Sequence, residues 1–154
     1  MNRFYNIPFI ACRELMPWEI KRRELPEGVG LYELETSFRF RSDIAGGIIE
    51  IDAGEISDLA SIPLALQKWV MSGDDPRIAG GGWVHDKLYR EGGRISVFDE
   101  DGTFIKVAQL TREQCDKILC DEAMVDLGAS RLDRWKVYRG LWVGGRFNFK
   151  KAQD

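Results

Sequence analysis

The residues of this chain best suited to acid–base chemistry lie in the segment Trp83-Val84-His85-Asp86-Lys87-Leu88-Tyr89. His85 is the only histidine among 154 residues, and Asp86 follows it directly. Histidine is the side chain whose unperturbed pKa lies nearest to neutrality. If an imidazole does acid–base work in this protein, it is therefore the imidazole of His85.

A histidine that acts as a general base needs a partner that orients its other ring nitrogen. Asp86 is poorly placed for this, because adjacent residues on a helix point about 100° apart. Asp116 is the best candidate on the helix predicted further along the chain. Its neighbours at i+3 and i+4 are Leu119 and Cys120, which put Asp116 at the edge of an apolar face. Asp86 is then left for a metal ion, a helix cap or solvent.

Two partners for the Asp116 carboxylate remain open. Arg112, one turn earlier, offers an exposed i,i+4 ion pair that contributes only tenths of a kcal/mol. His85 offers a hydrogen bond, and a half-buried carboxylate without one costs about 1–3 kcal/mol. Asp58 is a third carboxylate of interest, since it lies between a predicted strand and a predicted helix. A turn or cap former is the simpler interpretation of Asp58, although catalytic groups also concentrate on such loops.

Composition places these residues in an ordinary folded domain. Hydrophobic residues make up 44% and charged residues 31% of the chain, which is long enough for one domain with its own core. The net charge of −3 argues against non-specific nucleic-acid binding. Three cysteines with a single histidine and no C-x-x-C indicate free thiols rather than a zinc site. No apolar run is long enough to span a bilayer, and no signal peptide pattern begins the chain, so we expect synthesis in a cytoplasm.

Two hairpins are predicted from alternating apolar residues and turn signals. Residues 31–41 and 47–51 read as one pair of strands, and residues 94–98 and 103–107 as another. The second pair flanks Asp99-Glu100-Asp101-Gly102, a strong turn signal. Both pairs are therefore expected to form antiparallel ladders.

Capping signals predict the helices. One is expected over residues 61–71 and a second, carrying His85, from near Gly82. A third begins at Thr111, where Thr111-Arg112-Glu113-Gln114 fits a capping box, and stops at Gly128. The last starts at Ser130. Its stripe is predicted as core and consists of Leu132, Trp135, Tyr138 and Trp142.

These elements predict an α+β fold in which small antiparallel β-hairpins pack beside three or four short helices. Residues 1–30 are expected to be an irregular N-terminal arm, broken by three prolines. Residues 31–145 form the single globular domain, and residues 146–154 a C-terminal tail.

The order of three separated motifs resembles a family of uncharacterised proteins from tailed bacteriophages and prophages. The motifs are Ser57-Asp58-Leu59-Ala60-Ser61-Ile62-Pro63, His85-Asp86-Lys87-Leu88-Tyr89-Arg90, and Arg112 followed by Cys115-Asp116. The resemblance covers roughly residues 30–145. Serine stands at 57 where the family has threonine, cysteine stands at 115 where it has alanine, and residues 94–107 look like an insertion. The resemblance implies a phage origin, and the family brings no settled activity with it.

The His-Asp-x-x-Tyr helix with an aspartate on the next helix is also similar to secreted phospholipases that cleave the sn-2 ester. That resemblance implies that His85 is the base, Asp86 a calcium ligand and Asp116 the residue that orients His85. The flanking cysteines of those enzymes are replaced here by Gly, Val and Leu, so their disulfide framework is missing. Calcium is the one cofactor that this similarity suggests.

Two hypotheses of function follow. The first is a phage-encoded hydrolase that acts on the host envelope, either a lipid ester or the cell wall, with His85, Asp116 and Asp58 as catalytic residues. The alternative is a structural virion component of the tail or baseplate, in which His85 and Asp116 form a structural clasp. Other phage proteins or the host envelope are the expected partners, in the host cytoplasm or incorporated in the virion, and oligomer formation is left open.

Overall fold

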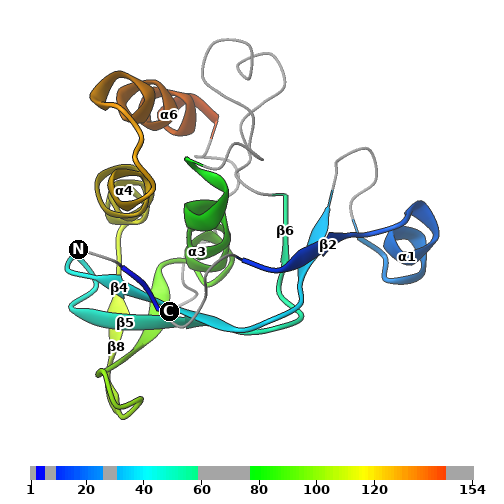
Figure 1. The fold of residues 1–154 in the computed structure, drawn as a ribbon, viewed down its shortest axis with the longest axis horizontal. Coiled ribbons are helices and arrows are strands. Elements are labelled where there is room, and N and C mark those ends of the chain that lie inside the picture. Colours follow the sequence, from blue (N-terminus) through cyan, green and yellow to red (C-terminus); the bar gives the residue numbers. More distant parts are fainter. Residues whose placement is uncertain (1–2, 6–9, 26–30, 59–76, 145–154) are drawn as a thin grey trace.

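The computed structural model describes residues 3–5, 10–25, 31–58 and 77–144 (Figure 1). Two antiparallel sheets and several helices make up this part of the chain, which confirms the predicted α+β class. The helix expected over residues 61–71 and the tail of residues 146–154 lie outside the described residues. No helix of the described part combines the length and apolar character that a membrane crossing requires.

The larger sheet has five strands in the order β1-β4-β5-β7-β8, namely Phe4–Tyr5, Phe38–Ser42, Gly47–Ile51, Arg94–Phe98 and Phe104–Gln109. Both predicted hairpins are confirmed within it. Strands β4 and β5 pair from Phe38↔Ile51 to Ser42↔Gly47, and β7 pairs with β8. In the β7–β8 turn the Asp99 carboxylate accepts hydrogen bonds from two backbone amides, as the turn chemistry requires.

The smaller sheet has three strands in the order β2-β3-β6, which are Cys12–Glu14, Tyr32–Leu34 and Ile56–Ser57. The single strand expected over residues 31–41 is therefore wrong. Glu35, Thr36 and Ser37 are exposed polar residues, and the chain leaves one sheet and enters the other across them. The N-terminal segment also differs from the irregular arm expected. Strand β1 belongs to the larger sheet and β2 to the smaller one, and a short helix, α1 (Pro17–Arg22), follows them.

The remaining described helices are α3 (Ala79–Arg90), α4 (Arg112–Lys117), the π-helix η1 (Ile118–Ala123), α5 (Met124–Asp126) and α6 (Arg131–Gly144). The capping box at Thr111 is confirmed, since Gln114 and Thr111 exchange hydrogen bonds. Gly128 follows α5 with φ of +82°, the left-handed conformation of a helix stop. In Figure 1, α3 and α4 lie on the same side of the five-stranded sheet.

Helix α3 begins at Ala79, before the start expected near Gly82, so the three consecutive glycines Gly80, Gly81 and Gly82 all lie inside the helix. Close packing explains why. A Cβ on Gly81 would lie 2.6 Å from Cδ1 of Leu119 and 2.7 Å from Cβ of Ala123, closer than side chains pack. Glycine thus lets α3 approach η1 one turn before His85.

The core lies between the large sheet and the helices α3 and η1, and α6 adds to it by packing against α4 and η1. Helix α6 faces this core with Val137 and Leu141, so the predicted core stripe is wrong. Three members of that stripe are about half exposed: Leu132 at 59%, Trp135 at 53% and Trp142 at 50%. The spacing selected the wrong face because the helix carries apolar residues on two sides, and periodicity alone does not say which side is covered.

Candidate functional site

His85, Asp116 and Tyr89 form a buried hydrogen-bonded cluster between α3 and α4. The Nε2 atom of His85 lies 2.9 Å from Oδ1 of Asp116, and the Tyr89 hydroxyl donates to the same oxygen. His85 and Tyr89 are one turn apart on α3, and their ring centroids are 4.1 Å apart. His85 and Asp116 are each 2% exposed. The predicted pairing of His85 with Asp116 is therefore present, and Tyr89 is a third member.

The cluster fixes the hydrogen-bonding role of each ring nitrogen of His85. The Oδ1 atom of Asp116 already accepts from the Tyr89 hydroxyl, so we assign to Nε2 the proton that points at this acceptor. The other nitrogen, Nδ1, is buried and has no hydrogen-bond partner among the described residues. Burial, and then the hydrogen bond to Asp116, raise the pKa of Tyr89 far above its ordinary value. Tyr89 thus stays protonated, and its hydroxyl group donates a hydrogen bond to Asp116.

The alternative partner for Asp116 is Arg112, and this ion pair is not formed within the described part of the chain. The positive charge of Arg112 instead acts on Tyr89, whose pKa it lowers in part. One terminal guanidinium nitrogen of Arg112 is buried with no hydrogen-bond partner among the residues described. The two-helix hydrogen bond to His85 is therefore preferred over the local i,i+4 pair.

Asp86 lies on a different side of α3 and meets the end of strand β6. The Ser57 hydroxyl donates a 2.6 Å hydrogen bond to Oδ2 of Asp86, and Asp58 shares a side-chain hydrogen bond with Asp86. Burial and the negative charge of Asp58 raise the pKa of Asp86 to about 7, against the lowering effects of Ser57 and His85. Asp58 and Asp86 are only partly buried, in contrast to His85. The hydrogen-bonded carboxyl groups of Asp58 and Asp86 thus meet where strand β6 ends against α3.

Ion pairs hold α3 against the segment that carries Ser57 and Asp58. The Lys87 ammonium lies 3.0 Å from the carboxylate of Glu55, and Arg90 contacts both Glu55 and the carbonyl oxygen of Ile56. Glu55 and Ile56 directly precede the serine of the site. Helix α3 therefore positions two groups at once, with His85 and Tyr89 toward α4 and Asp86 toward β6.

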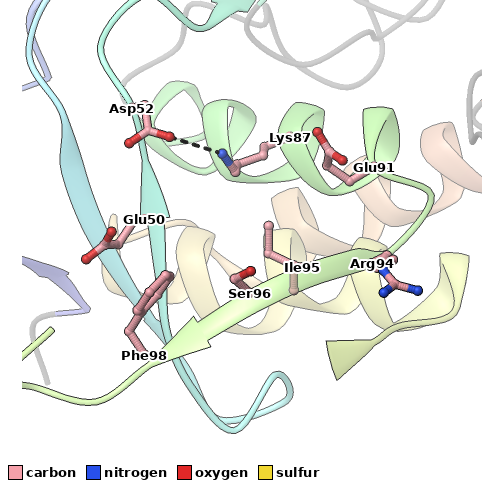
Figure 2. A pocket seen from close by; sticks show the side chains of 8 residues that line it. All are labelled: Glu50, Asp52, Lys87, Glu91, Arg94, Ile95, Ser96 and Phe98. Carbon is pink, nitrogen blue, oxygen red and sulfur yellow. Dashed lines mark ion pairs between the residues drawn. The ribbon is translucent and has the colours of Figure 1, made fainter. Parts of the chain in front are cut away.

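A charged cavity of about 270 Å³ borders this arrangement between α3, β5 and β7. Figure 2 shows Lys87 pointing toward Asp52, 3.6 Å away, with Glu50 and Glu91 on either side. Neither this cavity nor a second one of about 490 Å³ beside α6, both lined by described residues, includes His85 or Asp86. The imidazole is thus enclosed, whereas the Asp58–Asp86 pair lies nearer to the surface.

Other candidate ligands and nucleophiles add little to this site. Within the described residues, no three His, Cys, Asp or Glu side chains gather as they would to hold a metal ion. The expected calcium role of Asp86 stays a prediction, with Asp58 as the one acidic neighbour that the structure places beside it. The cysteines are free thiols, and burial raises the pKa of Cys115 to about 12, which keeps that thiol unreactive at neutral pH.

Sequence analysis missed two members of the site. Tyr89 is four residues after His85, a spacing that places both on one helix face, and this signal was available. Ser57 carries no such signal, because its bond to Asp86 joins residues 29 positions apart. The catalytic roles assigned to His85, Asp116 and Asp58 stay predictions.

A comparison with known families adds the following. A sequence model described as a protein of unknown function (DUF1353) matches residues 32–141, which include every site residue named above. No curated protein and no solved structure matches this chain. The match covers more than half of the chain, and the protein therefore belongs to the DUF1353 family.

Proposed function

We propose that this protein is a hydrolase whose acid–base pair is Asp58 and Asp86. The observation that carries the proposal is the half-buried pair of carboxyl groups, Asp58 and Asp86, which are joined by a hydrogen bond beside Ser57, and the raised pKa of Asp86, about 7, supports it. Catalytic acids and bases have pKa values close to the working pH, and paired carboxyl groups are one way to reach such values. In this proposal one carboxyl group of the pair is ionised and the other is protonated when the substrate binds.

The chemistry of such a pair is hydrolysis by general acid and base. The ionised carboxylate removes a proton from water, and the water oxygen forms a bond to the electrophilic carbon of an ester, amide or glycoside. The protonated carboxyl group gives its proton to the leaving oxygen or nitrogen as the bond to that carbon breaks. The pair gains one proton and loses one, so it ends the reaction with the two positions exchanged.

In this proposal the cluster of His85, Asp116 and Tyr89 positions the pair rather than touching the substrate. His85 is 2% exposed, so a polymeric or lipid substrate does not reach it in this conformation. Its influence on the reaction is indirect, because His85 acts to lower the pKa of the neighbouring Asp86. The base role given to His85 by sequence analysis passes to the carboxyl pair.

The proposed substrate is host envelope material, either a phospholipid ester or the cell wall, and the proposed origin is a phage. Both rest on the motif resemblances of the chain.

The test is hydrolysis of purified peptidoglycan and of phosphatidylglycerol–phosphatidylethanolamine vesicles, measured as soluble fragments and as free fatty acid. We expect the wild-type protein to release product from one of the two. Asp86→Asn and Asp58→Asn should each lower the rate about 100- to 10,000-fold with unchanged circular dichroism. Asp101→Asn, an exposed carboxylate of the β7–β8 turn, is the matched control and should keep full activity. Full activity of Asp86→Asn, or no product from either substrate, would reject the proposal.

The burial of His85 favours a second candidate, the structural virion component. A histidine enclosed with its aspartate and tyrosine partners is what a helix–helix clasp requires. In that case His85→Ala should lower thermal stability, and the protein should co-purify with phage particles. A protein that is absent from purified particles, with a His85→Ala variant as stable as the wild type, would exclude this candidate.

A further inference from the structure

Helix α6 presents an apolar surface away from the core. Four large apolar side chains are between 50% and 59% exposed there: Leu132, Trp135, Trp142 and Val143. At 100° per residue these positions lie within one face of the helix, opposite Val137 and Leu141. We call this set, together with Arg139, the α6 outer face. Single exposed apolar residues need no explanation, but a contiguous set with two tryptophans indicates a contact surface.

Cationic groups accompany the apolar ones on this face. The guanidinium of Arg139 lies over the rings of Trp135 and Trp142, at 5.7 Å and 5.9 Å from their centroids. Arg131 and Lys136 flank the same face. The acidic residue of the helix, Asp133, is already bound by Arg77 at 2.9 Å and by Ser130. Among the described residues of α6, no free carboxylate therefore balances these cations.

The charge of the helix points to an anionic partner. Helix α6 has four basic residues and one acidic residue, in a chain whose net charge is −3. A symmetric dimer through the α6 outer face would place Arg139 and its flanking cations against the same cations of a second copy. Like charges in contact disfavour that arrangement.

A cavity at the edge of this face has room for an anionic head group. It measures about 490 Å³ and lies between α4 and α6. Arg131, Arg134, Trp135 and Tyr138 line it together with Lys117 and two carboxylates, Glu113 and Asp121, and each carboxylate pairs with one of the cations. The Arg134 guanidinium makes only long contacts, 3.4 Å to Asp121 and 3.5 Å to the Cys120 carbonyl. Its Nε atom is buried and has no hydrogen-bond partner in the described part of the chain. An under-satisfied guanidinium in a cavity is suited to a phosphate oxygen.

We propose that the α6 outer face docks this protein onto an anionic lipid bilayer. Tryptophan rings fit the boundary between head groups and acyl chains, and arginine keeps its charge in the head-group layer while its stem stays among apolar groups. The flanking cations are drawn to anionic lipid, each by about fivefold in affinity. The inference does not depend on the proposed hydrolysis, because binding is measured without any product.

The test is co-sedimentation of the full-length protein with vesicles. We expect binding to vesicles of equal parts phosphatidylglycerol and phosphatidylethanolamine, weak binding to phosphatidylcholine vesicles, and loss of binding when NaCl rises from about 50 mM to about 500 mM. Trp135→Ala/Trp142→Ala should weaken binding at least about tenfold and Arg139→Glu by a similar factor. Trp18→Ala and Arg94→Glu are the matched controls. They change an exposed tryptophan and an exposed arginine outside α6, and both variants should bind vesicles as the wild type does.

Three outcomes would overturn the inference. The first is no binding to anionic vesicles by the wild type, and the second is unchanged binding by the double tryptophan variant. The third is a dimer of the wild type, seen by light scattering, that becomes a monomer in the double variant, since the face would then be occupied by a second copy. Circular dichroism of each variant verifies folding, which is expected because the substituted side chains are exposed.

Discussion

Replacing Asp116 with alanine is the sharpest test of the buried cluster. The change removes the acceptor of two hydrogen bonds and leaves Nε2 of His85 and the Tyr89 hydroxyl as buried donors. A hydrogen bond to a charged group contributes about 1.5–3 kcal/mol, so the two together predict a loss of about 3–6 kcal/mol. A domain of this size has a total stability of about 5–15 kcal/mol. At about 2–4 °C per kcal/mol, we expect Tm to fall by about 6–24 °C.

Urea unfolding followed by tryptophan fluorescence measures this loss, since Trp83 is buried on α3, the helix that carries His85 and Tyr89. Asp116→Asn is the graded variant, because its carbonyl oxygen still accepts both hydrogen bonds, and it should lose about 1–2 kcal/mol. Asp121→Ala is the matched control on the same helical segment. Its side chain is 57% exposed, so the loss should stay below about 1 kcal/mol. If Asp116→Ala were no less stable than Asp121→Ala, the cluster would not have the energetic role given to it here.

Three further predictions concern stability. The pKa of Asp86 is raised on folding, so the folded state binds more protons than the unfolded state between about pH 4 and 7. The free energy of unfolding should therefore fall as the pH rises through that range, and this pH dependence should be weaker in Asp86→Asn. Gly81→Ala should cost about 1–3 kcal/mol from the clash with η1, whereas Gly80→Ala, whose nearest contact is 3.2 Å, should be close to neutral in calorimetry. Glu122→Ala should cost about 2–4 kcal/mol in urea unfolding, because its buried carboxylate accepts from two backbone amides of the β4–β5 turn; a loss below about 1 kcal/mol would contradict that assignment.

Local signals account for the parts of the fold that sequence analysis predicted. The capping box at Thr111 and the helix stop at Gly128 each depend on residues within about one turn, and both are present in the structure. The two hairpins follow from turns of four and five residues. The elements whose structure differs from the prediction depend on contacts with residues far away in the sequence. The triple glycine continues α3 because η1 packs against Gly81, and no local pattern contains that information.

The same distinction applies to the site. His85 and Asp116 were paired because a lone histidine and a carboxylate at the edge of an apolar face each lacked a partner, which is a local argument on both sides. The pairing of Asp86 with Asp58 and Ser57 was not predicted. It depends on where strand β6 meets α3, and a contact between a strand end and a helix side is set by tertiary packing.

The most direct test of the central claim is an NMR titration of the Asp86 carboxyl carbon in protein labelled with 13C-aspartate. We expect a midpoint near pH 7 in the wild type, and a lower midpoint in Asp58→Asn, because the charge of Asp58 is then removed while the burial of Asp86 still raises its pKa. A wild-type midpoint near 4 would contradict this expectation, since burial and the charge of Asp58 would then not raise the pKa of Asp86.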